Sequence, residues 1–318
     1  SRVICEGLLA VGRERGDDAL MGFAYYYLAE AYFVDNQYRP FISSLLLGLE
    51  CQLQAPVPLL LAKSYNMLGI SASYAGNPSM AMDHYLTALQ YADQNGLSYA
   101  AAVANSNIGN IYRELGEPEA AVTYLKKALS CFEACSPTQD RHRNLSTTYS
   151  SLATCYLDAG DTDSAIAWFG QQDLRQGELH SDAHIAALSF EIQYFHTLGN
   201  YAQRDVAIGS MLSTVENTAS LMGVYDDLFS LCGFLYKIGY FDELWRLLCR
   251  IDTLTVQSGI THMILKTLSY KIYYYQGKGM EEVYLSACAE YFALSKQLEE
   301  ETQLSLKNDI RLREDLEK

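Results

Sequence analysis

Two histidines have the most suggestive chemical spacing in the chain. His180 and His184 lie four residues apart in the segment HSDAH, which places both imidazoles on one face of a helix. A zinc site needs at least one further ligand, and no other residue has a defined spacing from this pair. We therefore interpret HSDAH as an ordinary helix start, and the equally spaced Cys131 and Cys135 as ordinary helix residues. The sequence predicts no metal site and no cofactor.

The short motifs that build catalytic or phosphate-binding centres are missing from the sequence. It contains no GxGxxG, GxxxxGK[ST], HExxH or GxSxG pattern. The acidic run Glu299-Glu300-Glu301 is typical of the solvated face of a helix rather than of a catalytic carboxylate pair. We predict no catalytic residue and expect that this chain is not an enzyme.

Composition narrows the classes of partner. With 38 acidic against 23 basic residues the formal charge is −15, which disfavours nucleic acid and anionic membranes because both need a basic surface. No run of 18 apolar residues predicts a membrane span. The eight cysteines form no CxxC motif, so we expect free thiols and a cytoplasmic protein. The first residues lack an initiator Met and a signal pattern, so we expect a trimmed start.

The elements that must position any functional residue recur about every 40 residues. Each unit has a small or apolar anchor on a first helix, followed about seven residues later by a turn residue and then a second helix. A period of this size with two helices per unit predicts an all-α helical solenoid of about seven hairpins. The anchors are Ala29, Gly69, Gly109, Ala153, Ile192, Cys232 and Tyr270, and the turn residues are Asn36, Gly76, Gly116, Gly160, Gly199, Gly239 and Gly277.

Residue types within the middle units explain why hairpins form. Gly just past a helix takes the left-handed conformation without a penalty, and Pro after it starts the next helix. The small anchors let the two helices of a hairpin approach closely, opposite the small residues Ala81, Ala121 and Ala165. Tyr85, Leu125 and Phe169, four residues further on, are expected to fill the space between neighbouring units.

This pattern resembles the tetratricopeptide repeat (TPR) family. The matching residues include Leu68-Gly69, Ala81 and Tyr85, and then Gly109, Tyr112 and Ala128. The resemblance is strong over residues 60–170 and weaker over 20–55 and 180–290, and the period of about 40 exceeds the 34 of the family. It implies a right-handed superhelical fold, and a HEAT-like array is the alternative. We expect residues 1–293 to form this domain.

A single long helix is predicted after the last turn, because residues 280–318 contain no Gly or Pro. We expect residues 294–318 to be a connector or coiled-coil segment whose narrow apolar stripe supports a homodimer. A frayed, solvated terminal helix is the alternative. The stripe includes Leu298, Ile310, Leu312 and Leu316.

The tail also resembles a narrower group. The segment Ile310-Arg311-Leu312-Arg313-Glu314-Asp315-Leu316-Glu317 is similar to the helix between long TPR arrays and a diguanylate cyclase (GGDEF) domain in bacterial signalling proteins. That resemblance implies a sensory input region for an output domain. The sequence itself contains no GGDEF signature.

The candidate binding residues are those expected on the concave side, which the first helix of each hairpin lines. They are mostly polar, a composition that suits hydrogen bonds to an extended peptide. A carboxylate clamp is disfavoured, because no lysines accompany the Asn and Arg residues of the middle units. The candidates are Tyr26, Glu30, Asn66, Ser73, Asn110, Arg113, Gln193, His196, Tyr236, Lys271 and Tyr274.

The sequence thus predicts a non-catalytic module that binds a protein or peptide and acts as sensory input or scaffold for an output domain. Two alternatives remain open at this point. One is a pure interaction scaffold without switching. The other is a peptide-pheromone type of receptor, which the acidic charge and the position of the connector disfavour.

Overall fold

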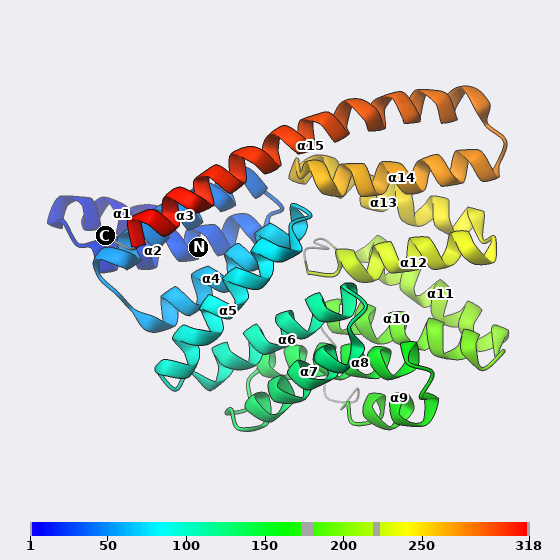
Figure 1. Cartoon of the computed structure of the whole chain (residues 1–318), viewed down its shortest axis with the longest axis horizontal. Helices are drawn as coiled ribbons and strands as arrows, with labels where there is room; N and C mark the ends of the chain where they lie inside the picture. The colour runs from blue at the N-terminus through cyan, green and yellow to red at the C-terminus, as the bar shows by residue number, and fades with distance from the viewer. Residues whose placement is uncertain (1, 173–180, 219–222, 317–318) are drawn as a thin grey trace. The chain divides into compact units, whose positions relative to one another are not determined.

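The computed structural model describes residues 2–172, 181–218 and 223–316, and within 301–316 it describes the side chain of Gln303 alone. Over these ranges the chain is helical and contains no strand (Figure 1). The predicted all-α architecture of long helical hairpins that end in an extended helix is therefore confirmed.

The hairpins follow one another along the chain. A single helix, α1, precedes them, and the pairs α2/α3 to α14/α15 each form one hairpin. The helices are α1 (Arg2–Arg15), α2 (Asp18–Val34), α3 (Tyr38–Gln54), α4 (Pro58–Tyr74), α5 (Pro78–Gln94), α6 (Ser98–Glu114), α7 (Pro118–Glu133), α8 (Gln139–Asp158), α9 (Thr162–Phe169), α10 (Ser181–Thr197), α11 (Tyr201–Asn217), α12 (Tyr225–Ile238), α13 (Phe241–Ser258), α14 (Thr261–Gly277) and α15 (Glu281–Leu316).

One turn geometry closes every hairpin. In each turn a backbone N–H beyond the helix donates to the carbonyl five residues earlier, the outer bond of a Schellman motif. The residue before that N–H has a positive φ, between 58° and 80°. These bonds run from Gln37 to Tyr32, Asn77 to Ala72, Glu117 to Tyr112, Asp161 to Tyr156, Asn200 to Phe195, Tyr240 to Leu235 and Met280 to Tyr275, at 2.8–2.9 Å.

The turn residues predicted from sequence hold this left-handed position, with one correction. In the last hairpin the left-handed residue is Gly279 (φ 68°), and Gly277 is instead the last residue of α14. The helix therefore extends two residues further than expected, and the absence of a Cβ at Gly277 leaves room for the Phe241 ring. In the first hairpin Asn36 takes the position with φ 58°, as asparagine tolerates better than most residues.

Close helix packing depends on the small anchors. A Cβ built on Gly109 would lie 2.7 Å from Leu125 Cγ and 3.3 Å from the Ala121 carbonyl oxygen. A Cβ on Gly69 would overlap the ring of Tyr85. Both glycines are therefore required for the approach of the second helix of their hairpin, as the sequence pattern predicts.

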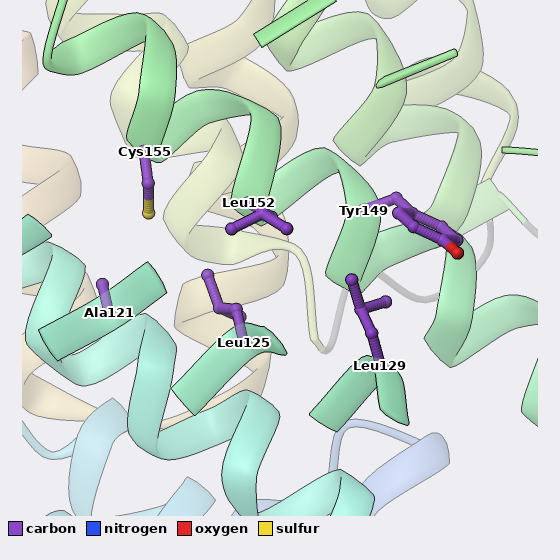
Figure 2. Packing of buried hydrophobic residues seen from close by; sticks show 6 residues of the cluster. All are labelled: Ala121, Leu125, Leu129, Tyr149, Leu152 and Cys155. Carbon is purple, nitrogen blue, oxygen red and sulfur yellow. The ribbon is translucent and has the colours of Figure 1, made fainter. Parts of the chain in front are cut away.

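Neighbouring hairpins share apolar clusters. Figure 2 shows one, in which Ala121, Leu125 and Leu129 of α7 face Tyr149, Leu152 and Cys155 of α8. The i, i+4, i+8 spacing on α7 and the i, i+3, i+6 spacing on α8 each define one helix face. Leu125 thus packs both on its own hairpin and on the next, as expected for residues that fill the space between units.

The chain divides into two compact units. Unit 1 comprises residues 1–56, 70–77 and 228–318, and unit 2 comprises residues 57–69 and 78–227. The first helices α6, α8 and α10 lie wholly in unit 2, whereas α2 and α14 lie in unit 1. The candidate residues are accordingly divided between two surfaces.

Helix α15 is one continuous element through the predicted boundary at residue 294. It packs on α14, and Gln297 Nε2 donates to Thr261 Oγ1 at 3.3 Å. Its backbone continues to Leu316, well past the start of α14. A separate connector at 294–318 stays a prediction.

Candidate functional site

The site in unit 2 centres on two side chains of α6 that the sequence predicts to face inward. Asn110 and Arg113 lie three residues apart, so they are neighbours on one face of the helix. Both are half-buried. Asn110 Oδ1 and Arg113 Nε are inaccessible to solvent and have no hydrogen-bond partner among the described residues. Buried polar atoms are nearly always paired in proteins, so an acceptor and a donor without partners on neighbouring residues make this face a candidate binding surface.

Carboxylates from later hairpins lie close to Arg113. Its charge acts on Asp158, at the end of α8, and on Asp227, in the first turn of α12. Desolvation raises the pKa of both carboxyl groups, and the Arg113 charge opposes that rise without cancelling it. A hydrogen bond from Ser189 of α10 also favours the charged form of Asp227. Side chains from the first helices of four hairpins, α6, α8, α10 and α12, therefore interact with one another electrostatically.

Asp227 is half-buried. Part of its surface is open to solvent, although the surrounding protein desolvates the carboxyl group enough to raise its pKa. Asp158 is exposed, so its neighbours act on it through a more strongly screened environment. The surroundings of Arg113 and Asp227 are thus of lower effective dielectric than bulk water.

Asn66 is engaged with the neighbouring hairpin. Its Oδ1 accepts a hydrogen bond from Asn107 Nδ2 at 2.8 Å, which joins α4 to α6 within unit 2. Ser106 and Thr148 form a similar contact between α6 and α8, with their hydroxyls 3.0 Å apart. Both pairs use the polar residues of first helices to hold neighbouring hairpins together.

Gln193 and His196 on α10 make contacts inside their own hairpin. Gln193 Nε2 donates to the Ser189 carbonyl at 3.3 Å. His196 Nδ1 lies 3.2 Å from Arg204 Nη1, and its ring is 5.8 Å from that of Tyr201. The predicted ligand-facing histidine therefore also contributes to packing against α11.

Unit 1 holds the N-terminal candidates. Tyr26 is buried, and its hydroxyl donates to Glu30 Oε1 at 2.7 Å. Burial and the neighbouring Glu30 carboxylate both raise the pKa of Tyr26. Ser73 is half-buried near the end of α4, where its carbonyl accepts from Gly76 N–H at 2.9 Å.

The C-terminal candidates of unit 1 belong to an aromatic and ionic surface. Tyr236 stacks on Tyr273 with ring centroids 5.2 Å apart, and Tyr274 stacks on Trp245 at 4.6 Å. Lys271 Nζ is 2.6 Å from Asp252 Oδ1. These three candidates are thus engaged in ring stacking or in an ion pair within unit 1.

The predicted dimer residues all belong to α15. Leu298 is half-buried. Ile310, Leu312 and Leu316 lie in the helical backbone of α15, but their side chains are outside the described residues. Their role in a homodimer remains a prediction.

The residues considered first for metal binding form no cluster. His180 lies outside the described residues, and among those described no three His, Cys, Asp or Glu residues gather as a metal site would require. Cys135 Sγ lies 3.2 Å from the Cys131 carbonyl oxygen, within one helical turn. None of the described helices is both long and apolar enough to span a membrane.

The sequence analysis missed the partners of Arg113. Asp158 lies five residues after the anchor Ala153, and Asp227 lies five residues before the anchor Cys232, so neither has an expected inward position. Acidic residues at the two ends of first helices were a usable signal. Their convergence depends on how successive hairpins rotate, which a single sequence does not specify.

Comparison with known proteins places this architecture in a recognised class. Residues 99–171, which span α6 to α9, match the family model described as Tetratricopeptide repeat. The match covers less than half of the chain. No curated protein matches the sequence.

Two solved structures are similar in fold. The Rap protein complexed with Competence and Sporulation Factor has a TM-score of 0.57 at 14% identity, with 88% of this chain and 76% of that chain covered. BtubC from P. vanneervenii has a TM-score of 0.52 at 18% identity, with 67% of this chain and 89% of that chain covered. At these identities the similarity concerns the fold, a TPR-like array of helical hairpins.

Proposed function

We propose that this chain is a non-catalytic binding module that takes up an extended segment of a protein or peptide on the face of unit 2 that carries Asn110, Arg113, Asp158 and Asp227. The single observation that carries this is the pair of unpartnered buried atoms, Asn110 Oδ1 and Arg113 Nε. One accepts and the other donates a hydrogen bond. Together they complement the N–H and C=O groups of an extended main chain.

The similar Rap structure supports the proposal at the level of fold, because that protein is complexed with a factor. The charges at the site add selectivity. Arg113, Asp158 and Asp227 lie in a partly desolvated region, where charge complementarity is worth more than in water. Ligand side chains next to the bound main chain would therefore be selected by charge.

Selection of peptides from a phage-displayed random library tests the proposal. We expect enriched sequences whose affinity, measured by calorimetry, falls about tenfold in Asn110→Ala and in Arg113→Ala, the value of one lost hydrogen bond. Glu119→Ala is the matched control, because Glu119 is exposed on α7, outside this face. Circular dichroism establishes that each variant is folded.

Two outcomes would contradict the assignment. One is a library that yields no enriched peptide. The other is a set of peptides whose affinity is the same for wild type, Asn110→Ala and Arg113→Ala, which would place binding elsewhere.

We further propose that the module acts as sensory input or scaffold for an output domain. The resemblance of residues 310–317 to the helix that precedes diguanylate cyclase domains supports a GGDEF output. A cytoplasmic location and dimerisation through α15 belong to the same proposal. Free cysteines at all eight positions are compatible with a reducing compartment.

A second candidate is a receptor of the peptide-pheromone type. The observation that favours it is the similarity to the Rap structure, which extends over 88% of this chain. A scaffold without switching is the remaining alternative. Peptide selection separates the first two from the third, since a pure scaffold would hold folded partners rather than short peptides.

A further inference from the structure

The turns of the hairpins are not equivalent in their surroundings. A Cβ built on Gly116, Gly160, Gly199, Gly239 or Gly279 would meet no atom within 4 Å, so those five turns are open. The turns of the first two hairpins, at Asn36 and Gly76, are both in contact with the C-terminal helices of unit 1. This difference is unexpected for a repeat whose turns share one geometry.

The first contact is a hydrogen bond between parts of the chain 218 residues apart. Asn36 Nδ2 donates to the carbonyl oxygen of Leu254, near the end of α13, at 2.8 Å. Asn36 is half-buried, and its Oδ1 is buried without a hydrogen-bond partner in the described part of the chain. Among described residues it is the one non-glycine with a positive φ. The side chain at this position therefore makes a contact that the usual glycine would lack.

The second contact lies one helix further along. A Cβ on Gly76 would overlap the imidazole ring of His262, the second residue of α14. The glycine is thus needed twice, for its φ of 77° and for the space that the ring occupies. The hydroxyl of Tyr38, at the start of α3, lies 2.8 Å from Ser71 Oγ on α4. That bond ties the first turn to the second.

We propose that the Asn36 and Gly76 turns form an intramolecular latch on α13 and α14, and that the chain exchanges between a latched and a released state. The latch includes the hydrogen bond from Asn36 to Leu254 and the packing of Gly76 against the His262 ring. A single hydrogen bond contributes little enough free energy for binding energy to shift the balance. The latch does not depend on which ligand binds at the proposed site in unit 2.

The latch has a direct connection to the C-terminal helix. Thr261, next to His262 in sequence, accepts the hydrogen bond from Gln297 of α15. Release at His262 would therefore loosen the point at which α15 is held to α14. In this way a change at the first two hairpins would reach the helix that leads out of the repeats.

Chemical modification of His262 tests the latch without a ligand. Diethyl pyrocarbonate labels accessible imidazoles, and mass spectrometry gives the rate at His262 relative to the exposed His142 of the same molecule. Asn36→Gly keeps the left-handed turn and removes only the side-chain bond. We expect it to raise the relative rate at His262 about fivefold, the equilibrium value of one hydrogen bond.

A second pair of variants separates the latch from backbone strain. Gly76→Ala and Gly116→Ala introduce the same strain, because their φ angles are 77° and 76°, but only the first displaces the His262 ring. We expect faster labelling of His262 in Gly76→Ala and wild-type labelling in Gly116→Ala. An unchanged His262 rate in Asn36→Gly, or equal rates in the two alanine variants, would overturn the proposal.

Discussion

Two regions of the chain build the same hairpin with different side chains. In α6–α9 of unit 2 small residues meet across each hairpin, Gly109 with Ala121 and Ala153 with Ala165, and all four are buried. In unit 1 the corresponding positions on α12 and α13 are Cys232 and Leu244, which are equally buried. The family model matches the first region, at residues 99–171, and not the second.

The two regions show which residues form the hairpin and which produce the match to the family model. Both regions share the turn with a left-handed glycine, at Gly116 and Gly160 in unit 2 and at Gly239 in unit 1. They differ at the facing positions between the two helices, which are small in unit 2 but are Cys232 and Leu244 in unit 1. Aromatic stacking occurs in both regions, as in Tyr112 on Tyr124 in unit 2 and Tyr236 on Tyr273 in unit 1. Turn chemistry therefore specifies the hairpin, and the small residues specify only how closely its helices approach.

The largest expected effect breaks the close approach in unit 2. In Gly109→Ala the new Cβ meets the fully buried Leu125 and the backbone of Ala121, neither of which has room to move. We expect a loss of about 1–3 kcal/mol in the free energy of unfolding, the usual cost of overpacking. Urea denaturation followed by circular dichroism measures it.

Two alanine variants serve as controls for that loss. Gly233→Ala in unit 1 meets first the mobile end of Tyr270, its hydroxyl at 3.2 Å, so we expect stability close to wild type. Gly209→Ala meets no atom within 4 Å in α11 and should gain up to about 1 kcal/mol from helix propensity. Equal losses at Gly109 and Gly233 would remove the distinction between the two regions.

The next effect tests the turn that the regions share. Gly160 in unit 2 and Gly239 in unit 1 have φ of 80° and 78°, and both turns are open. Gly160→Ala and Gly239→Ala should each cost about 1–2 kcal/mol, because a Cβ disfavours the left-handed conformation. Thermal unfolding compares them. A cost at only one of the two positions would mean that the turn does not specify both hairpins.

This division explains how much of the fold could be predicted from sequence. Five turns could be predicted from their glycines, because a residue just past a helix end adopts the left-handed conformation most easily when it has no Cβ. They are the turns at Gly76, Gly116, Gly160, Gly199 and Gly239. Gly277 was predicted as the turn residue because it lies seven residues after Tyr270, whereas the observed turn residue Gly279 lies seven residues after Ile272. The error thus came from the choice of anchor, and the glycine and spacing rules still locate the turn.

The candidate site was predictable to a lesser degree. Asn110 and Arg113 share one helix face, as periodicity predicts, and each has one buried atom without a hydrogen-bond partner among the described residues. Their role in binding a ligand stays a prediction. His196 has the same periodicity, yet its Nδ1 contacts Arg204 because α11 carries an arginine where α5, α7 and α9 carry alanine. Helix periodicity predicts which residues share a face. Contacts with neighbouring helices determine which of those side chains already have a partner within the protein.

The smallest expected effect contrasts a desolvated carboxylate of unit 2 with an ion-paired carboxylate of unit 1. Desolvation raises the pKa of Asp227. Asp252 instead lies 2.6 Å from Lys271 Nζ, whose side chain is 18% exposed. Asp227→Asn should therefore raise the melting temperature at pH 7, whereas Asp252→Asn should lower stability by up to about 1 kcal/mol.

The pH dependence gives this contrast a sign. A carboxyl group with a higher pKa in the folded protein binds its proton more tightly when folded, so its contribution to stability is greatest below the ordinary pKa of about 3.9 and is lost as the pH rises through the raised value. Wild type should approach Asp227→Asn in melting temperature as the pH falls toward about 4 and separate from it toward pH 7. A constant difference across this range would show that the asparagine acts through packing or the Ser189 hydrogen bond, and not through removal of a desolvated charge.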